Sequence, residues 1–544
     1  MSEAETLPSS GSGSQQFTQL KAHLGGRHFF KKEWLARMAV LLIALPSAIC
    51  AICYLKQLLS LIVLRNETVV SYPEGASVYG FLTAFQTHRL YHSPFEFPWN
   101  AQLFGPVFLM AGAWFARILH GDPNSTTELM RSVSFLALLG SIAIVGYLCW
   151  RLERQIRWAA AAMLLALGCS WLVPFASVAR PDTPSIFLMF AALAFYETAE
   201  GKLWFFYLAG VLSALSILTK QNTAPALLGL LIDCLWARKF SKAAQYVAGG
   251  MTASILILLP LWLRHELFLA NFAAIRFVVP DWPSVPRMLD LFIRSNEIAA
   301  VAIFIAVLGA AWSWKDRRYR SILLATALAW LSNVAALANA GGAYNYLILP
   351  WLLTMLFVPA GIKRLEQWGA HAIWIPAALF LFAAAITYHQ RDLLANDLPG
   401  PLDASIVADL NVLSDMPYLE LRSRQPQMLD PYTYNELSLR KAWSDAPLRQ
   451  RIDAENYDLV LIAEGNGGTE AVFSVRSYRG ISFWGVGVIR EITLHYRPLC
   501  ETSDHLALVP LDRAVSISSE TIAHIFHEPC RVSRREPQVA SGAS

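Results

Sequence analysis

The chain has 544 residues, of which 55% are hydrophobic and only 15% are charged, and its mean hydropathy is +0.40. Soluble domains carry nearer a quarter charged residues, so the composition excludes an ordinary soluble enzyme and indicates a polytopic membrane protein. The net charge of +4 is modest and unevenly placed, which suits membrane topology and gives no reason to expect a nucleic-acid partner.

The N-terminal segment, residues 1–33, begins as a Ser-, Gly- and Gln-rich stretch without the apolar region of a signal peptide. It is predicted to be disordered. Its basic residues, among them Lys31 and Lys32, and Arg37 just after it indicate a cytoplasmic N-terminus. The first apolar span, which starts near Trp34, is expected to act as an uncleaved signal-anchor.

With this first span, the chain has twelve apolar runs, and each is a candidate for crossing the membrane because a spanning helix needs about 20 apolar residues. They lie at about 36–64, 101–119, 131–150, 158–176, 183–199, 203–219, 222–237, 244–264, 298–314, 321–339, 344–361 and 370–388. If all twelve crossed, the strongly basic loops would fall outside the cytoplasm, against the usual distribution of Lys and Arg.

The charge distribution becomes consistent if the run 101–119 lies along the outer surface without crossing, as Pro106 and two glycines in that run favour. The short outer turns then carry only Arg180 and Lys220. The short cytoplasmic loops carry thirteen basic residues, namely Arg151, Arg154, Arg157, Lys202, Arg238, Lys239, Lys242, Lys315, Arg317, Arg318, Arg320, Lys363 and Arg364. We therefore expect an α-helical polytopic membrane protein with about eleven transmembrane helices over residues 34–389.

This topology predicts two large outer loops, at 65–130 and 265–297, the second with an amphipathic helix around 287–294. It also places residues 390–530 outside the cytoplasm as a small α/β domain, followed by a disordered tail, 531–544. The domain is expected to contain strands at 457–463, 481–489 and 491–496 and a helix over 437–451. Whether Cys500 and Cys530 pair in it stays open.

The first outer loop holds polar side chains beside hydrocarbon-compatible sequence. Glu74 follows Pro73, and it is either an acidic residue at a helix start or a general base at the membrane boundary. His88 and Arg89 lie farther along the loop and are candidates for substrate binding.

The two outer cations are exceptions to the charge distribution, and such exceptions are candidate functional residues. Arg180 begins an Arg-Pro-Asp triplet that ends in Asp182, which is either a helix cap or a catalytic residue. Lys220 lies at the same outer level, and the two cations could together neutralise a phosphate. Tyr344 and Asn345, beside two glycines in a further outer turn, could bind a sugar, although an interfacial aromatic belt also explains the tyrosine.

The histidine spacing contains no recognisable zinc site, and there is neither a P-loop nor a dinucleotide-binding fingerprint. No metal ligand is therefore assigned. A divalent cation stays open as a possible cofactor.

Several short motifs occur in the order found in one family. They are Tyr72-Pro73-Glu74-Gly75, Leu103-Phe104-Gly105-Pro106, Arg131, Arg180-Pro181-Asp182, Thr219-Lys220-Gln221 and Tyr344-Asn345-Tyr346. With the layout of spans and loops, they resemble the GT-C superfamily of membrane glycosyltransferases, and in particular the protein O-mannosyltransferases, the lipid A aminoarabinose transferases and their bacterial relatives. The resemblance covers roughly residues 35–390.

The resemblance implies an inner-membrane enzyme that transfers a sugar from a polyprenyl-phosphate donor to an acceptor hydroxyl of a glycan, lipid or protein on the extracytoplasmic face, with inversion. It also implies that an acid of the first outer loop is the base and that cations stabilise the departing phosphate. The family often has an Asp-Glu pair where this chain has Pro73 and Glu74. Either Glu74 is the base, or catalysis is altered or lost.

Two other functions stay open. One is a transporter or flippase of a lipid-linked glycan, although transporters usually show inverted repeats that this chain lacks. The other is a catalytically inactive membrane subunit of the same fold.

Overall fold

The structure is a computed structural model that describes most of the chain between Tyr72 and Arg531. The described residues are 72–167, 169, 172–274, 280–294, 297–338, 345–368, 403–426, 431–463, 477–478, 481–482, 484–502 and 505–531. The N-terminal segment 1–33, the apolar runs 36–64 and 370–388, Tyr344 and the tail beyond residue 531 lie outside the described residues.

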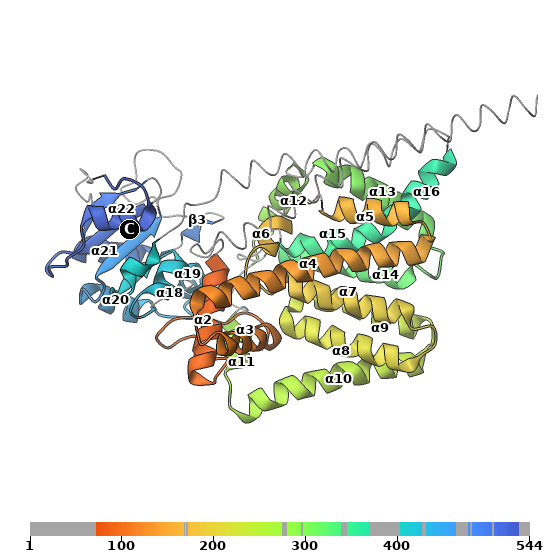
Figure 1. The fold of residues 1–544 in the computed structure, drawn as a ribbon, viewed down its shortest axis with the longest axis horizontal. Coiled ribbons are helices and arrows are strands. Elements are labelled where there is room, and N and C mark those ends of the chain that lie inside the picture. The colour runs from red at the N-terminus through yellow and green to blue at the C-terminus, as the bar shows by residue number, and fades with distance from the viewer. Residues whose placement is uncertain are drawn as a thin grey trace, which may run out of the picture.

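Residues 72–368 form a body of helices (Figure 1). In chain order these are α2 (Tyr72–Thr87), α3 (Pro106–Ile118), α4 (Pro123–Glu153), α5 (Ile156–Leu167), α6 (Leu172–Ala176), α7 (Asp182–Thr198), α8 (Leu203–Thr219), α9 (Ala224–Trp236), α10 (Phe240–Leu263), α11 (Phe268–Ala274), α12 (Ser284–Arg294), α13 (Glu297–Ser313), α14 (Arg320–Ala336), α15 (Asn345–Thr354) and α16 (Val358–Trp368). Every apolar run predicted between 101 and 361 overlaps at least one of these helices. The amphipathic helix expected at 287–294 is part of α12.

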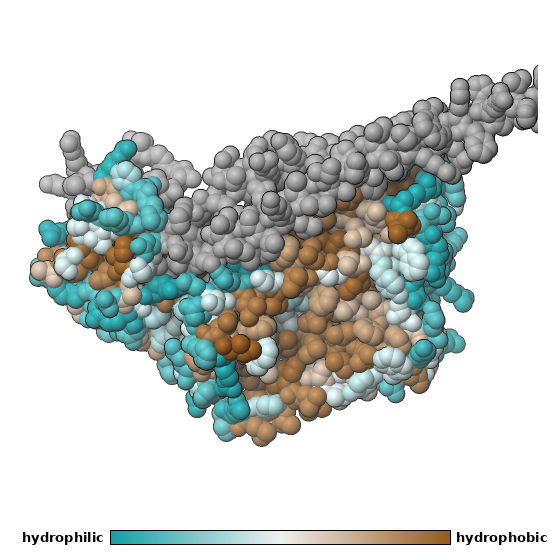
Figure 2. Space-filling view, viewed as in Figure 1, coloured by the Kyte–Doolittle hydropathy of each residue, from teal (hydrophilic) through white to brown (hydrophobic). Residues whose placement is uncertain are grey.

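Three helical segments of the described part are long and apolar enough to cross a membrane: Pro123–Glu153, Phe240–Leu263 and Asn345–Gln367. Figure 2 shows a broad hydrophobic face over the helical body that ends in hydrophilic surface on the right-hand side of the view. The molecule is therefore mostly helical and suited to a membrane, whereas the number of about eleven spans stays a prediction.

Helix α3 corresponds to the run that was expected to lie along the outer surface. Its 13 residues extend over about 20 Å, too short for a hydrocarbon core of about 30 Å. Met110, Trp114 and Ile118, spaced four residues apart, form an exposed apolar stripe on one side of the helix. Such a helix fits an interfacial position better than a transmembrane one.

The loops predicted to be cytoplasmic meet at one end of the helical body. Arg151 at the end of α4 pairs with Glu200 in the α7–α8 turn (3.2 Å), and Lys363 in α16 pairs with Glu153 (2.8 Å). Arg320 at the start of α14 pairs with Asp233 in α9. The relative positions of these loops therefore agree with the charge analysis.

The C-terminal region forms a small α/β domain, as expected, on the left of Figure 1. Its four-stranded sheet has the order β1-β2-β6-β5, with β1 and β2 parallel and the other neighbours antiparallel. The strands are β1 (Val412–Ser414), β2 (Leu459–Ala463), β5 (Tyr496–Glu501) and β6 (His505–Pro510), with a separate pair β3 (Ser477–Tyr478) and β4 (Ile481–Ser482). The helices are α18 (Pro417–Arg422), α19 (Pro431–Leu439), α20 (Ala446–Asp453), α21 (Val486–His495) and α22 (Ser519–Phe526).

The strand predicted at 457–463 is confirmed as β2, but two other predictions for this domain were wrong. Residues 486–495, expected in two strands, form helix α21. Val488 and Ile492, four residues apart, are buried on one face of this helix, a periodicity that the many β-branched residues concealed. The helix expected over 437–451 is divided into α19 and α20, since Pro447 starts a new helix.

The loop between α2 and α3 attaches this domain to the helical body. Trp99 packs edge-on against Trp443, with ring centroids 5.7 Å apart, and both are buried in one apolar cluster. The Tyr434 hydroxyl donates a hydrogen bond to the Pro94 carbonyl oxygen. This loop and the C-terminal domain thus share a core.

Cys500 and Cys530 form a disulfide that connects β5 to the segment after α22. Replacing both by serine is expected to lower the unfolding free energy of the domain by about 3 to 4 kcal/mol, because the bond closes a loop of about 30 residues. Thermal unfolding of the purified full chain would measure the effect. Reductant should shift the wild type to the variant's value and leave the variant unchanged; equal melting of both proteins without reductant would contradict the prediction.

Candidate active site

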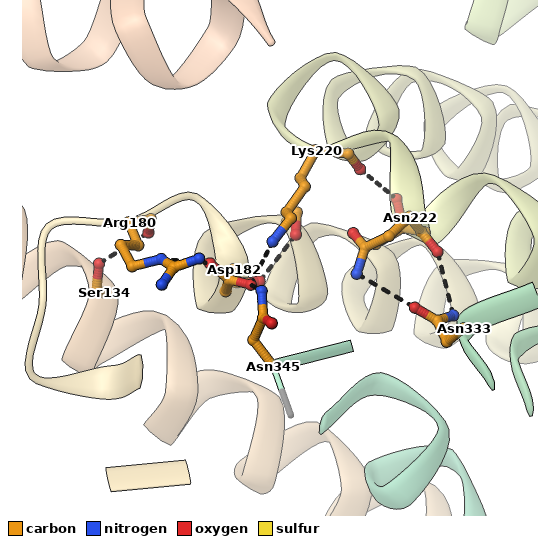
Figure 3. A network of polar contacts seen from close by, with 9 residues as sticks. Ser134, Arg180, Asp182, Lys220, Asn222, Asn333 and Asn345 are labelled. Atoms are coloured by element: carbon orange, nitrogen blue, oxygen red, sulfur yellow. Dashed lines mark hydrogen bonds and ion pairs between the residues drawn. The ribbon is translucent and has the colours of Figure 1, made fainter. Parts of the chain in front are cut away.

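Side chains from three separate segments of the sequence, those of Arg180, Lys220 and Asn345, meet around Asp182 (Figure 3). Lys220 Nζ lies 2.5 Å from Asp182 Oδ1, and Arg180 Nε lies 3.2 Å from Asp182 Oδ2. Asn345 Nδ2 donates to Asp182 Oδ1 over 2.6 Å. We call these four residues the Asp182 cluster. The structure thus brings together Arg180, Asp182, Lys220 and Asn345, as expected from their common outer level.

The cluster lies where three helix ends meet. Asp182 is the first residue of α7, Lys220 directly follows the last residue of α8, and Asn345 is the first residue of α15. The Lys220 ammonium also lies over the Tyr346 ring, 5.1 Å from its centroid. Tyr346 was part of a recognised motif, but only the contact across helices shows that its ring faces the lysine.

The cluster is buried and carries an excess of positive charge. The exposed fractions are 1% for Asp182, 5% for Lys220 and 9% for Arg180. Within the described part of the chain, Asp182 is the one carboxylate within 4 Å of these two cations. Burying a charge is costly unless it is paired, so one further anion would be stabilised here.

The motif Leu103-Phe104-Gly105-Pro106 packs against this site. The Gly105 amide donates to the Thr219 carbonyl oxygen (3.2 Å), one residue before Lys220. A Cβ at Gly105 would lie 1.9 Å from the Leu218 carbonyl oxygen, so only glycine permits this approach. Helix α3 is therefore anchored beside the lysine.

Glu74 lies next to the cluster but is held by a different partner. It is completely buried, and its two carboxylate oxygens each lie 2.8 Å from a nitrogen of Arg131 in α4. The Ala179 amide, one residue before Arg180, also donates to Glu74 (2.6 Å). The bidentate pair fixes α2 to α4, and the hydrogen bond from Ala179 fixes the Arg180 loop to Glu74. These contacts give Glu74 a positioning role. Its predicted role as the base stays a prediction.

His88 and Arg89 are not brought to the Asp182 cluster. They directly follow α2 at the end opposite to Glu74, and 14 residues of helix separate His88 from Glu74 by about 21 Å. Both are exposed and line an open pocket of about 650 Å³ with Arg117, Arg264 and two further residues. This position does not test the predicted role of His88 and Arg89 in substrate binding.

Arg131 is one of the motif residues in the sequence, but the motif alone assigns it no role. A signal for a role of Arg131 is present in the sequence, since this basic residue begins the apolar run 131–150. Among the described residues no group of three or more His, Cys, Asp and Glu side chains lies close enough to hold a metal ion. The divalent cation that was left open therefore has no such group in that part of the chain.

Two solved structures share the fold over almost their whole length. The structure of ArnT from Cupriavidus metallidurans bound to undecaprenyl phosphate has a TM-score of 0.55 at 12% identity and covers 88% of this chain and 99% of its own. Its apo form has a TM-score of 0.56 at 12% identity, with 87% and 98% covered. ArnT is a lipid A aminoarabinose transferase of the GT-C superfamily. The chain has the GT-C fold.

The archaeal oligosaccharyltransferase AglB from Archaeoglobus fulgidus is also similar, with a TM-score of 0.46 and 12% identity over 79% of this chain and 69% of AglB. No family model matches the sequence, and no curated protein sequence matches it. The GT-C fold expected from the motifs is confirmed by the ArnT comparison, at an identity that by itself would not have shown it.

Proposed function

We propose that this protein is an integral-membrane glycosyltransferase that transfers a sugar from a polyprenyl-phosphate donor to an acceptor hydroxyl on the extracytoplasmic face, with inversion. The observation that supports this most is the charge of the Asp182 cluster. Two buried cations share one carboxylate, so the site has one positive charge to offer an anion. A lipid phosphate supplies such a charge, and the GT-C fold is found in a protein solved with undecaprenyl phosphate.

In the proposed reaction, the acceptor oxygen attacks the anomeric carbon from the face opposite to the phosphate, and the bond from that carbon to the phosphate oxygen breaks. The proton of the acceptor hydroxyl passes to the base, for which Glu74 is the proposed residue. The departing polyprenyl phosphate gains negative charge as the bond breaks. Lys220 and Arg180 would stabilise that charge, and they are already oriented, so little reorganisation is needed during the reaction. Asp182 positions both cations without contacting the reacting carbon.

Asn345 is proposed to contact the sugar. Its amide nitrogen is engaged by Asp182, whereas its buried carbonyl oxygen has no hydrogen-bond partner among the described residues. Buried acceptors are usually satisfied, so a sugar hydroxyl would be a suitable donor. Tyr344 and the pair His88 and Arg89 are proposed to contact the sugar or the acceptor farther from the phosphate.

The outer location of the cluster rests on the distribution of basic residues. The thirteen basic residues of the short loops predicted to be cytoplasmic contrast with two at the level of the cluster. Because Lys and Arg are retained in the cytoplasm, the end that holds the cluster is proposed to face outward, with the C-terminal domain on the same side.

Binding of undecaprenyl phosphate by Lys220 variants tests the proposal. Lys220→Gln is expected to weaken binding by about 10- to 100-fold, since a hydrogen bond to a charged group contributes about 1.5 to 3 kcal/mol. Lys202→Gln is the matched control, because Lys202 precedes the same helix at its other end and also lies over an aromatic ring, that of Phe205. Microscale thermophoresis with detergent-purified protein measures both affinities.

Two results would count against the proposal. Equal affinity of Lys220→Gln and the wild type would remove the lysine from phosphate binding. Tight binding by the wild type without transfer from any polyprenyl-phosphate sugar would instead favour the inactive subunit.

A further inference from the structure

A second charged pocket lies at the other end of the helical body, away from the Asp182 cluster. It encloses about 610 Å³ and is lined by the α7–α8 turn, the α9–α10 turn and the start of α14. Glu197, in its lining, follows Asp182 by 15 residues in α7, which is about 22 Å along the helix axis. The proposed sugar transfer does not use it.

The pocket is lined by more cations than carboxylates. Five basic residues contribute to it, namely Arg238, Lys239, Lys242, Arg317 and Arg320. The three carboxylates of the lining, Glu197, Glu200 and Asp233, have partners already. Asp233 accepts from Arg320 and from the Tyr196 hydroxyl, Glu200 pairs with Arg151, and Glu197 accepts from the Ser321 hydroxyl.

The other four cations of the lining are not ion-paired with any carboxylate in the described part of the chain. Lys239 and Lys242 lie three residues apart at the N-terminal end of α10, and Arg317 reaches the pocket from the α13–α14 connection. Lys242 Nζ lies 4.9 Å from the centroid of the Phe206 ring, which holds it over the pocket wall. This arrangement suits a ligand with negative charge.

The rim of the pocket carries exposed aromatic side chains. Trp236 lines the pocket and is 69% exposed, and the neighbouring Phe240 is 65% exposed. Exposed aromatic residues at a helix end are typical of the level of lipid headgroups. Figure 2 shows hydrophilic surface on the right-hand side of the view, where the hydrophobic face of the helical body ends, and Figure 1 shows the α7–α8 and α9–α10 turns on that side.

We propose that this pocket binds the phosphodiester headgroup of an anionic phospholipid from the leaflet at this end of the bundle. The cations Lys239, Lys242 and Arg317 would contact the phosphate, while the exposed Trp236 lies beside the acyl chains. A soluble phosphate would use the same cations but would gain nothing from the aromatic rim. The inference does not depend on the proposed sugar transfer.

Native mass spectrometry of the full chain, titrated with phosphatidylglycerol, tests this. The Lys239→Gln/Lys242→Gln variant is expected to retain the lipid about fivefold less tightly for each cation removed. Arg154→Gln/Lys315→Gln is the matched control, because both residues are exposed cations at the same end, lie over tryptophan rings and do not line the pocket. It should bind like the wild type.

Two further titrations, with phosphatidylcholine and with inorganic phosphate, separate the possible ligands. Weak binding of phosphatidylcholine and no displacement of the anionic lipid by inorganic phosphate would support the proposal. Three results would overturn it: unchanged affinity in the pocket variant, equal loss in the control variant, or complete displacement by inorganic phosphate. A variant that retained sugar transfer but lost the lipid would show the two sites to be independent.

Discussion

Asp182→Asn is expected to reduce sugar transfer by about 100- to 1,000-fold, the range found when a group that stabilises developing charge is lost. The substitution keeps the shape of the side chain and removes the charge that holds Lys220 and Arg180 in place. Both cations would then be buried without a carboxylate and would leave their positions. Because the carboxylate acts through the two cations, the KM for the donor should rise while kcat falls.

Release of polyprenyl phosphate from a panel of radiolabelled polyprenyl-phosphate sugars by the reconstituted full chain measures this effect. Asp290→Asn is a suitable control, since Asp290 forms a similar ion pair with Arg294 on an exposed helix face. Thermal unfolding of each variant separates a loss of activity from a loss of folded protein. Unchanged kcat and KM in a folded Asp182→Asn variant would refute the role of the cluster.

Glu74→Gln is expected to destabilise the protein by about 3 to 5 kcal/mol, because it leaves the guanidinium of Arg131 buried without its counterion. Arg131→Gln should have a similar effect, since it leaves the buried Glu74 carboxylate without the Arg131 guanidinium. Removing both charges together should cost less than the sum of the two single substitutions, because neither charge is then left unpaired. Thermal unfolding of the detergent-purified variants measures all three effects.

The same three variants test the predicted role of Glu74 as the base. If Glu74 only positions α2 and the Arg180 loop, the double variant should recover activity together with stability. If Glu74 is the base, the double variant should be stable and inactive. Equal stability of the wild type and the single variants would show instead that the buried pair does not hold these elements together.

Much of the fold and part of the site were accessible from the sequence because hydrophobicity and charge act locally. Long apolar runs require helices, and basic loops have to share one side of the membrane. Arg180 and Lys220 stood out as exceptions to that rule, and the structure places both on Asp182. The two exceptions to the charge distribution therefore indicated two cations that lie together in the structure, without any knowledge of the fold.

The secondary-structure prediction failed where strand-favouring residues also follow a helical periodicity. Residues 486–495 are rich in β-branched side chains, which favour strands, yet the domain uses them as helix α21. Packing of Val488 and Ile492 against the sheet outweighed that preference. Local propensity is a weak guide when burial against a neighbouring element decides the outcome.

By itself, the sequence indicated a helical membrane protein with a small C-terminal α/β domain, and it singled out two cations of the candidate site. Only the tertiary structure decided which carboxylate each cation holds. Glu74 and Asp182 both appeared as acids near one surface, but Arg131 engages the first, while Arg180 and Lys220 share the second. The reason is physical: ion pairs between distant segments depend on how helices pack, and that information is distributed over the whole chain.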